Sequence, residues 1–468
     1  MSGDPILSAA EIAERVRARE LSPVEVAEAA LARLERVNPA LNAVVTPNPN
    51  AIEEARAIAR RMMRRGDPGL LAGVPVGIKD VTEVAGLRTT YGSPLYTNHV
   101  PDQDALVVQR LRAAGAVILG KTNTPEFAAG GNTWNDVFGR TRNPWNLARS
   151  AGGSTGGGAA ALATGIIALA EGTDLGGSLR IPASFCGVVG LRPSPGLVPT
   201  HPAGWAWDTL QVTGGLARTA EDLALMLQAV AGPSEYAPLR QPTEGRDFVA
   251  AVRAGARKGL RLAYCADIAG IGVDPAIERV CRGAALDLIE AGHEVEVIKL
   301  DLAFGRDAFL ALRGEWFVAW MYDKLDGIDG FGVNVRNNTN AGLTGDPRAL
   351  GAAHQARGRI WQLFREFFTR FDHLLAPTMA VPPFPVEKNY PETVASRTMQ
   401  TYVDWIAPTF VLSLPGLPVA SVPCGLDADG MPVGLQIVGP PEGEERVLAL
   451  ASLVQQQQPI GAPPVDRP

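Results

Sequence analysis

Two glycine–serine segments stand out in this sequence, GGSTGG at residues 152–157 and DLGGSLRIP at residues 174–182. In each segment a serine, Ser154 or Ser178, follows a Gly-Gly pair, where the backbone can adopt shapes that are closed to other residues. A lone lysine, Lys79, stands upstream in LAGVPVGIKD at residues 71–80. Two serines and a lysine are enough for acyl transfer without a histidine if the lysine is held neutral. The three segments together therefore indicate acyl-transfer chemistry.

Further short motifs flank these segments and return near the C-terminus. They read GAVILGKTN at 115–123, RNPW at 142–145, FCGVVGL at 185–191, GLP at 416–418 and MPVGLQ at 431–436. In this combination the chain resembles the amidase signature family of serine hydrolases. The resemblance is strong from about 70 to 230 and from about 370 to 450, and it is weak between 235 and 365.

The resemblance implies an α/β fold, in which a large mixed twisted central sheet is flanked by helices in an α/β/α arrangement. Because the motifs lie towards both ends of the chain, we expect a single amidase domain. We expect this domain to span residues 1–468. Within it we expect an N-terminal helical segment over 1–65, the signature core over 70–230, and a variable substrate-side region over 235–365.

Composition and charge favour an ordinary enzyme with a large core. Of the 468 residues, 46% are hydrophobic and 20% are charged, and the net charge of −6 provides no basic footprint for nucleic acid or an anionic membrane. We therefore expect a small-molecule amide as the partner, no nucleic acid, no membrane, and a monomer or homodimer.

The cysteines and the N-terminus favour a cytoplasmic protein. The four cysteines are scattered, without a Cys-x-x-Cys pair, which is typical of free thiols in a reducing compartment. The first residues lack the basic segment and apolar run of a signal peptide.

Local patterns predict several elements. Ser8–Glu20 is predicted as a helix with a capping box between Ser8 and Glu11. A second helix is predicted from Ser22-Pro23 to about Val37, stopped by Asn38-Pro39. The apolar stretch from Gly156 to Ala170 is predicted as one buried helix, too short to span a membrane. Further predicted strands are Val74–Ile78, Ala116–Leu119, Gly187–Leu191, Leu260–Tyr264, Glu294–Ile298 and Leu374-Leu375.

Ser178 ends a turn whose consecutive backbone N–H groups can point into one anion-binding concavity. A tetrahedral acyl intermediate needs such donors. The resemblance implies that Ser178 is the nucleophile and that the N–H groups of Leu175, Gly176, Gly177 and Ser178 form the oxyanion hole. A side chain at 176 or 177 would be expected to crowd the substrate carbonyl.

The resemblance also implies that Ser154 follows a cis peptide bond and bridges Ser178 and Lys79. As a base Lys79 must be neutral, and burial lowers the pKa of a lysine by up to about 3–5 units. The adjacent Asp80 would oppose that shift, but neighbouring strand residues face opposite sides, so we expect Asp80 to point elsewhere.

Other residues are expected to support the site. Asp174 and Arg180 flank the nucleophile and are expected to hold its turn, and Thr155 retains a hydroxyl where the family commonly has a second serine. Substrate-binding candidates in loop-like stretches and at positions implied by the resemblance are Ala128, Gly130, Trp134, Trp205 and Trp207.

The predicted reaction is cofactor-free hydrolysis of a carboxylic amide bond through a Ser178 acyl-enzyme, with no metal. Esters and carbamates (urethanes) are further substrate classes that the family covers. One alternative is the glutamine-hydrolysing A subunit of an amidotransferase, although residues 335–342 match its basic stretch poorly. A more remote alternative is an α/β-hydrolase esterase, because residues 152–156 fit its Gly-x-Ser-x-Gly elbow but follow a turn-like segment rather than a strand.

Overall fold

A mixed sheet forms the centre of the computed structural model, which describes residues 6–466. Within that range eleven strands pair in the order β1-β3-β2-β6-β8-β7-β14-β15-β11-β9-β10. β2 lies between β3 and β6 and is parallel to both, whereas β8 is antiparallel to β6 and β7. The strands are β1 (Val44–Pro47), β2 (Pro75–Lys79), β3 (Val117–Thr122), β6 (Leu169–Asp174), β7 (Val189–Arg192), β8 (Val212–Ala217), β9 (Arg261–Tyr264), β10 (Glu294–Val297), β11 (His373–Pro377), β14 (Val419–Leu426) and β15 (Pro432–Val438).

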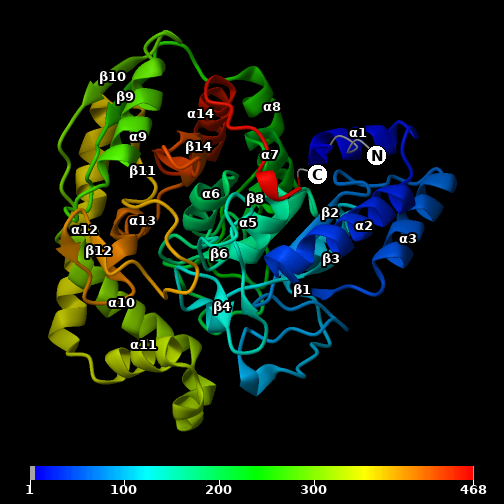
Figure 1. The fold of residues 1–468 in the computed structure, drawn as a ribbon, viewed down its shortest axis with the longest axis horizontal. Helices are drawn as coiled ribbons and strands as arrows, with labels where there is room; N and C mark the ends of the chain where they lie inside the picture. Colours follow the sequence, from blue (N-terminus) through cyan, green and yellow to red (C-terminus); the bar gives the residue numbers. More distant parts are fainter. Residues whose placement is uncertain (1–5, 467–468) are drawn as a thin grey trace.

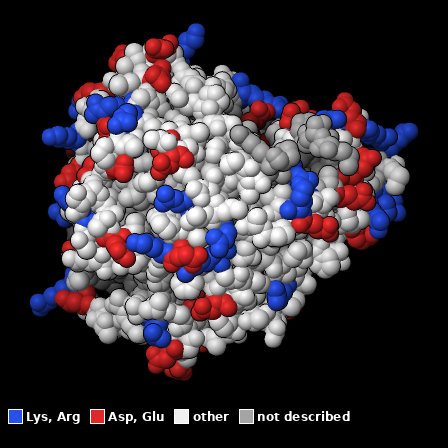
Figure 2. Space-filling view, in the orientation of Figure 1, with Lys and Arg blue, Asp and Glu red and all other residues white. Residues whose placement is uncertain are grey.

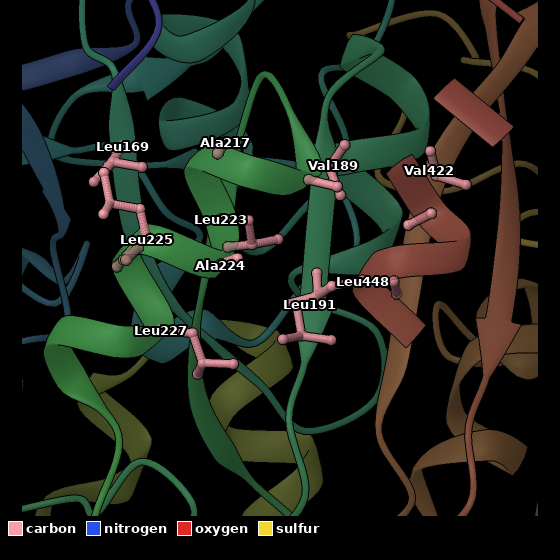
Figure 3. Packing of buried hydrophobic residues seen from close by; sticks show 14 of the residues in the cluster. Leu169, Val189, Leu191, Ala217, Leu223, Ala224, Leu225, Leu227, Val422 and Leu448 are labelled. Carbon is pink, nitrogen blue, oxygen red and sulfur yellow. The ribbon is translucent and has the colours of Figure 1, made fainter. Parts of the chain in front are cut away.

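One face of the sheet is covered by helices from distant parts of the chain. Buried residues of these helices pack in one cluster with the strands, and Figure 3 shows Leu169, Val189 and Leu191 of the sheet in that cluster. α14 lies beside α7 and α8, although α14 comes from the C-terminal end of the chain (Figure 1). The helices are α1 (Ala9–Arg17), α4 (Leu106–Ala113), α7 (Ala220–Val230), α8 (Phe248–Ala254), α9 (Pro275–Asp287) and α14 (Glu444–Gln457).

The opposite face carries a second layer of helices. Neighbouring strand residues divide between the layers: Leu169 packs in the first cluster and Ala170 in a cluster on the other face. The arrangement is therefore α/β/α, as predicted. This second layer contains α2 (Pro23–Leu41), α5 (Gly156–Ala163), α6 (Arg180–Cys186), α10 (Gly305–Trp320), α12 (Pro347–Arg370) and α13 (Ala407–Ser413).

The remaining elements are short or peripheral. α3 (Ala51–Met63) packs beside α2 and β3, and α11 (Val333–Leu343) packs beside α10. Two pairs of short strands lie outside the main sheet. These short elements are β4 (Trp134–Asn135), β5 (Gly139–Arg140), β12 (Thr393–Val394), β13 (Arg397–Thr398), η1 (Pro94–Tyr96), η2 (Glu126–Ala128), η3 (Tyr322–Gly330), η4 (Asp404–Ile406) and η5 (Pro464–Asp466).

The N-terminal helices confirm one prediction and correct another. The capping box between Ser8 and Glu11 is present in α1. The expected stop of the second helix at Asn38-Pro39 is wrong, because α2 continues to Leu41 with Pro39 inside it. A proline this close to a helix end removes only one intrahelical hydrogen bond. The Asn38 side chain also accepts the N–H groups of Ala43 and Val44 beyond the helix, at 2.9 Å each.

The apolar stretch from Gly156 to Ala170 is not one helix. α5 ends at Ala163, Gly165 takes a φ of +70°, and the chain then enters β6. A positive φ is readily available to glycine and breaks the helical path. Glu171, the charged residue that follows this apolar stretch, lies inside β6 and is fully buried.

No helix in residues 6–466 is long and apolar enough to cross a membrane. On the face shown in Figure 2, basic and acidic side chains are interspersed rather than gathered by sign.

Candidate active site

Lys79 is the last residue of β2, and its side chain is completely buried. Its Nζ atom lies 2.6 Å from Ser154 Oγ and 3.0 Å from Thr173 Oγ1, in two hydrogen bonds. A third, longer contact of 3.5 Å joins Nζ to the Thr173 carbonyl oxygen. A neutral amine has two N–H donors and one lone pair, so both donors can point to Thr173 while the lone pair accepts the Ser154 hydroxyl proton. The contacts around Nζ therefore suit an uncharged lysine.

The electrostatic surroundings of Lys79 favour the same state. Burial lowers the pKa of Lys79 well below its ordinary value of 10.5, against the opposing charges of Glu171 and Asp174. Asp80 takes no part in this balance. Its Oδ2 accepts the Thr90 hydroxyl at 2.5 Å and its Oδ1 lies 3.8 Å from Nζ of a second buried lysine, Lys121. Asp80 therefore points away from Lys79, as predicted.

Ser154 stands in the turn before α5, at the point where residues 152–157 approach β2. The Gly153–Ser154 peptide bond is cis, which the family resemblance had implied. A Cβ atom at position 153 would lie only 2.8 Å from the carbonyl oxygen of Gly130, so the close approach of these segments requires glycine. Thr155 donates its backbone N–H to the carbonyl oxygen of Ser178 at 3.2 Å. This bond ties the two serine turns together.

Ser178 lies in the turn between β6 and α6, and it is half-buried among fully buried neighbours. Asp174, at the end of β6, holds this turn from inside. Its carboxylate accepts the N–H groups of Gly177 at 2.8 Å and Leu179 at 3.2 Å. It also accepts two hydrogen bonds from Arg180, at 3.0 and 3.1 Å.

The charges around Asp174 are balanced within the core. Burial alone would raise the pKa of Asp174, but Arg180 and Arg192 outweigh it and hold that pKa well below its ordinary value. Arg180 is itself anchored by the Thr409 carbonyl oxygen at 2.8 Å and the Ser413 hydroxyl at 2.7 Å. The turn that carries Ser178 is therefore fixed to α13 by charged hydrogen bonds.

The hydrogen bond from Gly177 to Asp174 reduces the set of backbone N–H groups expected to be free for an oxyanion. The N–H of Gly177 is already bonded to Asp174, so it is not available to an oxyanion. Within the described chain, the N–H groups of Leu175, Gly176 and Ser178 make no hydrogen bond to protein. The sequence could not reveal this difference, because it depends on where the Asp174 carboxylate points.

The two glycines before Ser178 are required by packing. Gly177 has a φ of +128°, and a Cβ there would lie 2.3 Å from Thr409 Oγ1. A Cβ at Gly176 would lie 2.7 Å from the Phe309 ring. The expected crowding at these positions is thus with residues of α13 and α10.

A cavity of about 740 Å³ reaches Thr173, the residue that binds Lys79 Nζ, and within residues 6–466 its lining does not include Lys79, Ser154 or Ser178 themselves. Its wall is rich in aromatic rings, and several contact one another: Phe127 stacks on Tyr91 at 5.1 Å and meets Trp320 edge-on at 5.3 Å. Trp316 donates its indole N–H to Asp208 at 2.6 Å. The aromatic lining residues are Tyr91, Tyr96, Phe127, Trp205, Trp316, Trp320 and Tyr322.

Of the five predicted substrate-binding residues, the described cavity wall includes Trp205 only. Trp207 is 65% exposed, and Trp134 instead contacts the side chain of Asn389 and the guanidinium of Arg140. Ala128 follows the cavity residue Phe127, and both take a positive φ. Gly130 packs against the segment that carries the cis bond.

Sequence reasoning missed Thr173 and Glu171, the two polar side chains of β6 nearest to Lys79. They are two residues apart in a strand and therefore share one face. Polar residues spaced by two, directly before the DLGGS turn, were the available signal. The aromatic residues of α10 gave no comparable signal, because aromatic residues along a helix are equally typical of a core.

Comparisons with known proteins show the family of the chain. The profile of the family described as Amidase matches residues 25–310 and 331–448. The chain belongs to the amidase family. It is 37% identical to the acylamidase of Rhodococcus erythropolis over 97% of this chain and 96% of that protein. It is also 35% identical to the A subunit of the glutamyl-tRNA(Gln) amidotransferase from Carboxydothermus hydrogenoformans, over 96% of this chain and 97% of that protein.

Solved structures show the same likeness. A bacterial aryl acylamidase of the amidase signature family superposes with a TM-score of 0.91 at 30% identity, covering 99% of each chain. The chain is therefore an amidase, an enzyme that hydrolyses carboxylic amides.

Proposed function

We propose that this amidase hydrolyses acyl amides that carry an aromatic or other bulky apolar group, through an acyl-enzyme on Ser178. The observation that carries the proposal is the position of Thr173. This residue binds Lys79 Nζ and also lines the aromatic cavity, so Thr173 connects the cavity to the base. A concave cavity walled by aromatic rings, with polar groups placed among them, is typical of a small-molecule site.

The proposed chemistry moves one proton from Ser178 through Ser154 to Lys79, and its second step follows the 2.6 Å hydrogen bond between Ser154 Oγ and Lys79 Nζ. Ser178 Oγ attacks the carbonyl carbon and gives its proton to Ser154, while Ser154 gives its own proton to neutral Lys79. The negative oxygen of the tetrahedral intermediate accepts N–H bonds from Leu175, Gly176 and Ser178. When the C–N bond breaks, the proton returns through Ser154 to the leaving amine, and water then hydrolyses the Ser178 ester.

Asp174 and Arg180 hold the donor turn in this scheme, and Asp174 does so by occupying the N–H of Gly177. Thr155 aligns the two serines through its bond to the Ser178 carbonyl oxygen. The reaction needs no cofactor, because each proton transfer has a protein group to carry it. Esters and carbamates with similar apolar groups fit the same scheme, since their carbonyl carbons are attacked in the same way.

We further propose that the enzyme acts alone, as a cytoplasmic monomer or homodimer. All four cysteines are buried free thiols, which suits a reducing compartment. The amidotransferase alternative would require cationic groups for the carboxylate of glutamine. α11, which contains residues 335–342, has one basic residue, Arg336, and its guanidinium contacts the Asp329 carbonyl oxygen at 3.4 Å.

The test is hydrolysis by the purified chain without any partner. We expect release of nitroaniline from an aryl acylamide such as 4-nitroacetanilide, and no change when EDTA is added. The same preparation is assayed for glutamate release from glutamine. Glutaminase activity without anilide hydrolysis would contradict the proposal and favour the amidotransferase alternative.

A further inference from the structure

A second set of buried charged groups lies near Lys79, beyond the residues that bind its amine. The nearest is Glu171 of β6, which is fully buried. Its Oε2 accepts the backbone N–H of Lys79 at 3.1 Å, and its Oε1 accepts the hydroxyl of Thr82 at 2.9 Å. Both carboxylate oxygens are therefore engaged by the segment that carries the lysine.

The strand pairing explains why Glu171 makes this contact. The ladder between β2 and β6 pairs Val76 with Leu169 and Gly77 with Ala170, and it ends there. The N–H of Lys79 therefore bonds to no backbone oxygen of β6 and is satisfied by the Glu171 side chain instead. A buried N–H must find some partner. Glu171 thus fixes the backbone of Lys79 just beyond the point where the pairing of β2 with β6 ends.

A second lysine faces the same group. Lys121 of β3 is fully buried, and its Nζ donates to Thr89 Oγ1 at 2.9 Å and to the carbonyl oxygen of Thr82. Thr82 therefore connects the two charged groups, because its carbonyl binds Lys121 while its hydroxyl binds Glu171. Burial raises the pKa of Glu171 above its ordinary value, whereas the Thr82 hydroxyl, Lys79 and Lys121 oppose that rise by favouring the ionised carboxylate.

We propose that Glu171 is a positioning residue for Lys79, whose negative charge stabilises the ammonium that forms when Lys79 takes the serine proton. The proposal rests on the proposed role of Lys79 as the base. A buried carboxylate behind a catalytic imidazole works in the same way, because it orients the base and stabilises its protonated form. Glu171 does not line the described cavity, so it acts through Lys79 and not on the substrate.

The other charged groups around Lys79 leave Glu171 as its principal counter-charge. Asp174 is neutralised by Arg180 and Arg192. Asp80 faces Lys121 and Thr90, and Lys121 faces Asp80 and Thr82. On the remaining side, among residues 6–466, the Lys79 amine bonds to the uncharged residues Ser154 and Thr173.

The test is the pH dependence of kcat/KM for Glu171→Gln. The amide keeps the size of the side chain and can accept the Lys79 N–H, but it removes the charge. Without the charge, Lys79 loses its proton more readily, so the acid limb is expected to move to lower pH by about one unit or more. The plateau of kcat is expected to fall at least about tenfold, with KM unchanged.

Glu444→Gln is the matched control. Glu444 is also fully buried, but its carboxylate binds the backbone N–H of Ser194 and the guanidinium of Arg246 instead of the segment that carries Lys79. Its acid limb should coincide with that of the wild type. Glu171→Asp keeps the charge and should leave the limb near its wild-type position while lowering kcat. If Glu171→Gln does not fold, Thr82→Val carries the test, because losing the hydroxyl that supports the carboxylate should shift the limb in the same direction by less.

Suppose that the acid limb of the wild type depends on Lys79 and that folded Glu171→Gln has the same acid limb. The role proposed for Glu171 is then wrong, while the proposed role of Lys79 as the base still stands. If instead Lys79→Ala kept the wild-type limb, the role of Lys79 as base would fail, and this inference would fail with it.

Discussion

The backbone N–H of Gly177 donates a 2.8 Å hydrogen bond to Oδ1 of Asp174, three residues earlier in the chain. One donor of the expected oxyanion turn is thus used to hold the turn. The carboxylate that accepts it is also bound by Arg180 and Arg192, whose charges keep it ionised. The shape of the nucleophile turn therefore depends on a buried charge cluster.

Asp174→Asn is expected to destabilise the protein by about 3–5 kcal/mol, because it leaves two buried arginines without their shared counter-charge. Chemical unfolding followed by circular dichroism measures the effect. Asp429→Asn serves as the control, because Asp429 is exposed in the turn between β14 and β15. A loss below about 1 kcal/mol, the value of a surface pair, would mean that the cluster does not hold the turn.

Ser178→Ala is expected to lower kcat by about 10⁴-fold or more while leaving the melting temperature close to that of the wild type, because only one half-buried hydroxyl is removed. A fluorophosphonate probe should label the wild type at this serine and leave the variant unlabelled. Retention of more than a few per cent of the activity would show that another group is the nucleophile.

The lowered pKa of Lys79 predicts how the activity depends on pH. Burial lowers its pKa, and the base must be deprotonated, so kcat/KM should rise with pH through the lowered pKa and reach a plateau well below pH 10.5. Lys79→Arg should lose this activity, because a guanidinium does not deprotonate in that range. Near-normal turnover by Lys79→Arg would show that the residue acts as a fixed positive charge.

Substitution of Trp320 tests whether the substrate binds in the cavity. Trp320→Ala should raise KM for aryl amides by about tenfold or more and change KM for acetamide little, because the ring forms part of the aromatic wall. Trp361→Ala is the matched control, since Trp361 lies exposed on α12. Equal effects of both variants on the two substrates would contradict binding in this cavity.

His373, buried at the start of β11, predicts acid sensitivity of the fold. Burial lowers its pKa from 6.5 to about 4. The unfolded chain therefore binds a proton first as the pH falls, and the stability present above pH 6.5 is lost progressively down to about pH 4. Through this group, lowering the pH from about 8 to about 5 should reduce the free energy of unfolding by about 2 kcal/mol. Denaturant unfolding of wild type and His373→Gln should differ in that pH dependence, and identical slopes would argue against it.

Several elements could be predicted because their signals are local. The capping box of α1 depends on two side chains three residues apart, and β2, β9 and β10 stand out as short apolar or alternating runs with clear ends. The strands β6, β8, β14 and β15 were not predicted. They are buried on both faces or interrupted by glycine, as in VTGGLA at 212–217, so they show no alternation of polar and apolar residues.

The family, the α/β/α fold and the positions of Lys79, Ser154 and Ser178 can all be predicted from local sequence patterns. Those positions are marked by glycines that tight turns and close backbone contacts require within a few residues. Folding in three dimensions sets the hydrogen bond from Gly177 to Asp174, the contact of Glu171 with the backbone of Lys79, and the position of Trp316 and Trp320 of α10 at the cavity. These relationships depend on how far strands pair and on which distant side chains fill the space between them, and a one-dimensional pattern does not record either.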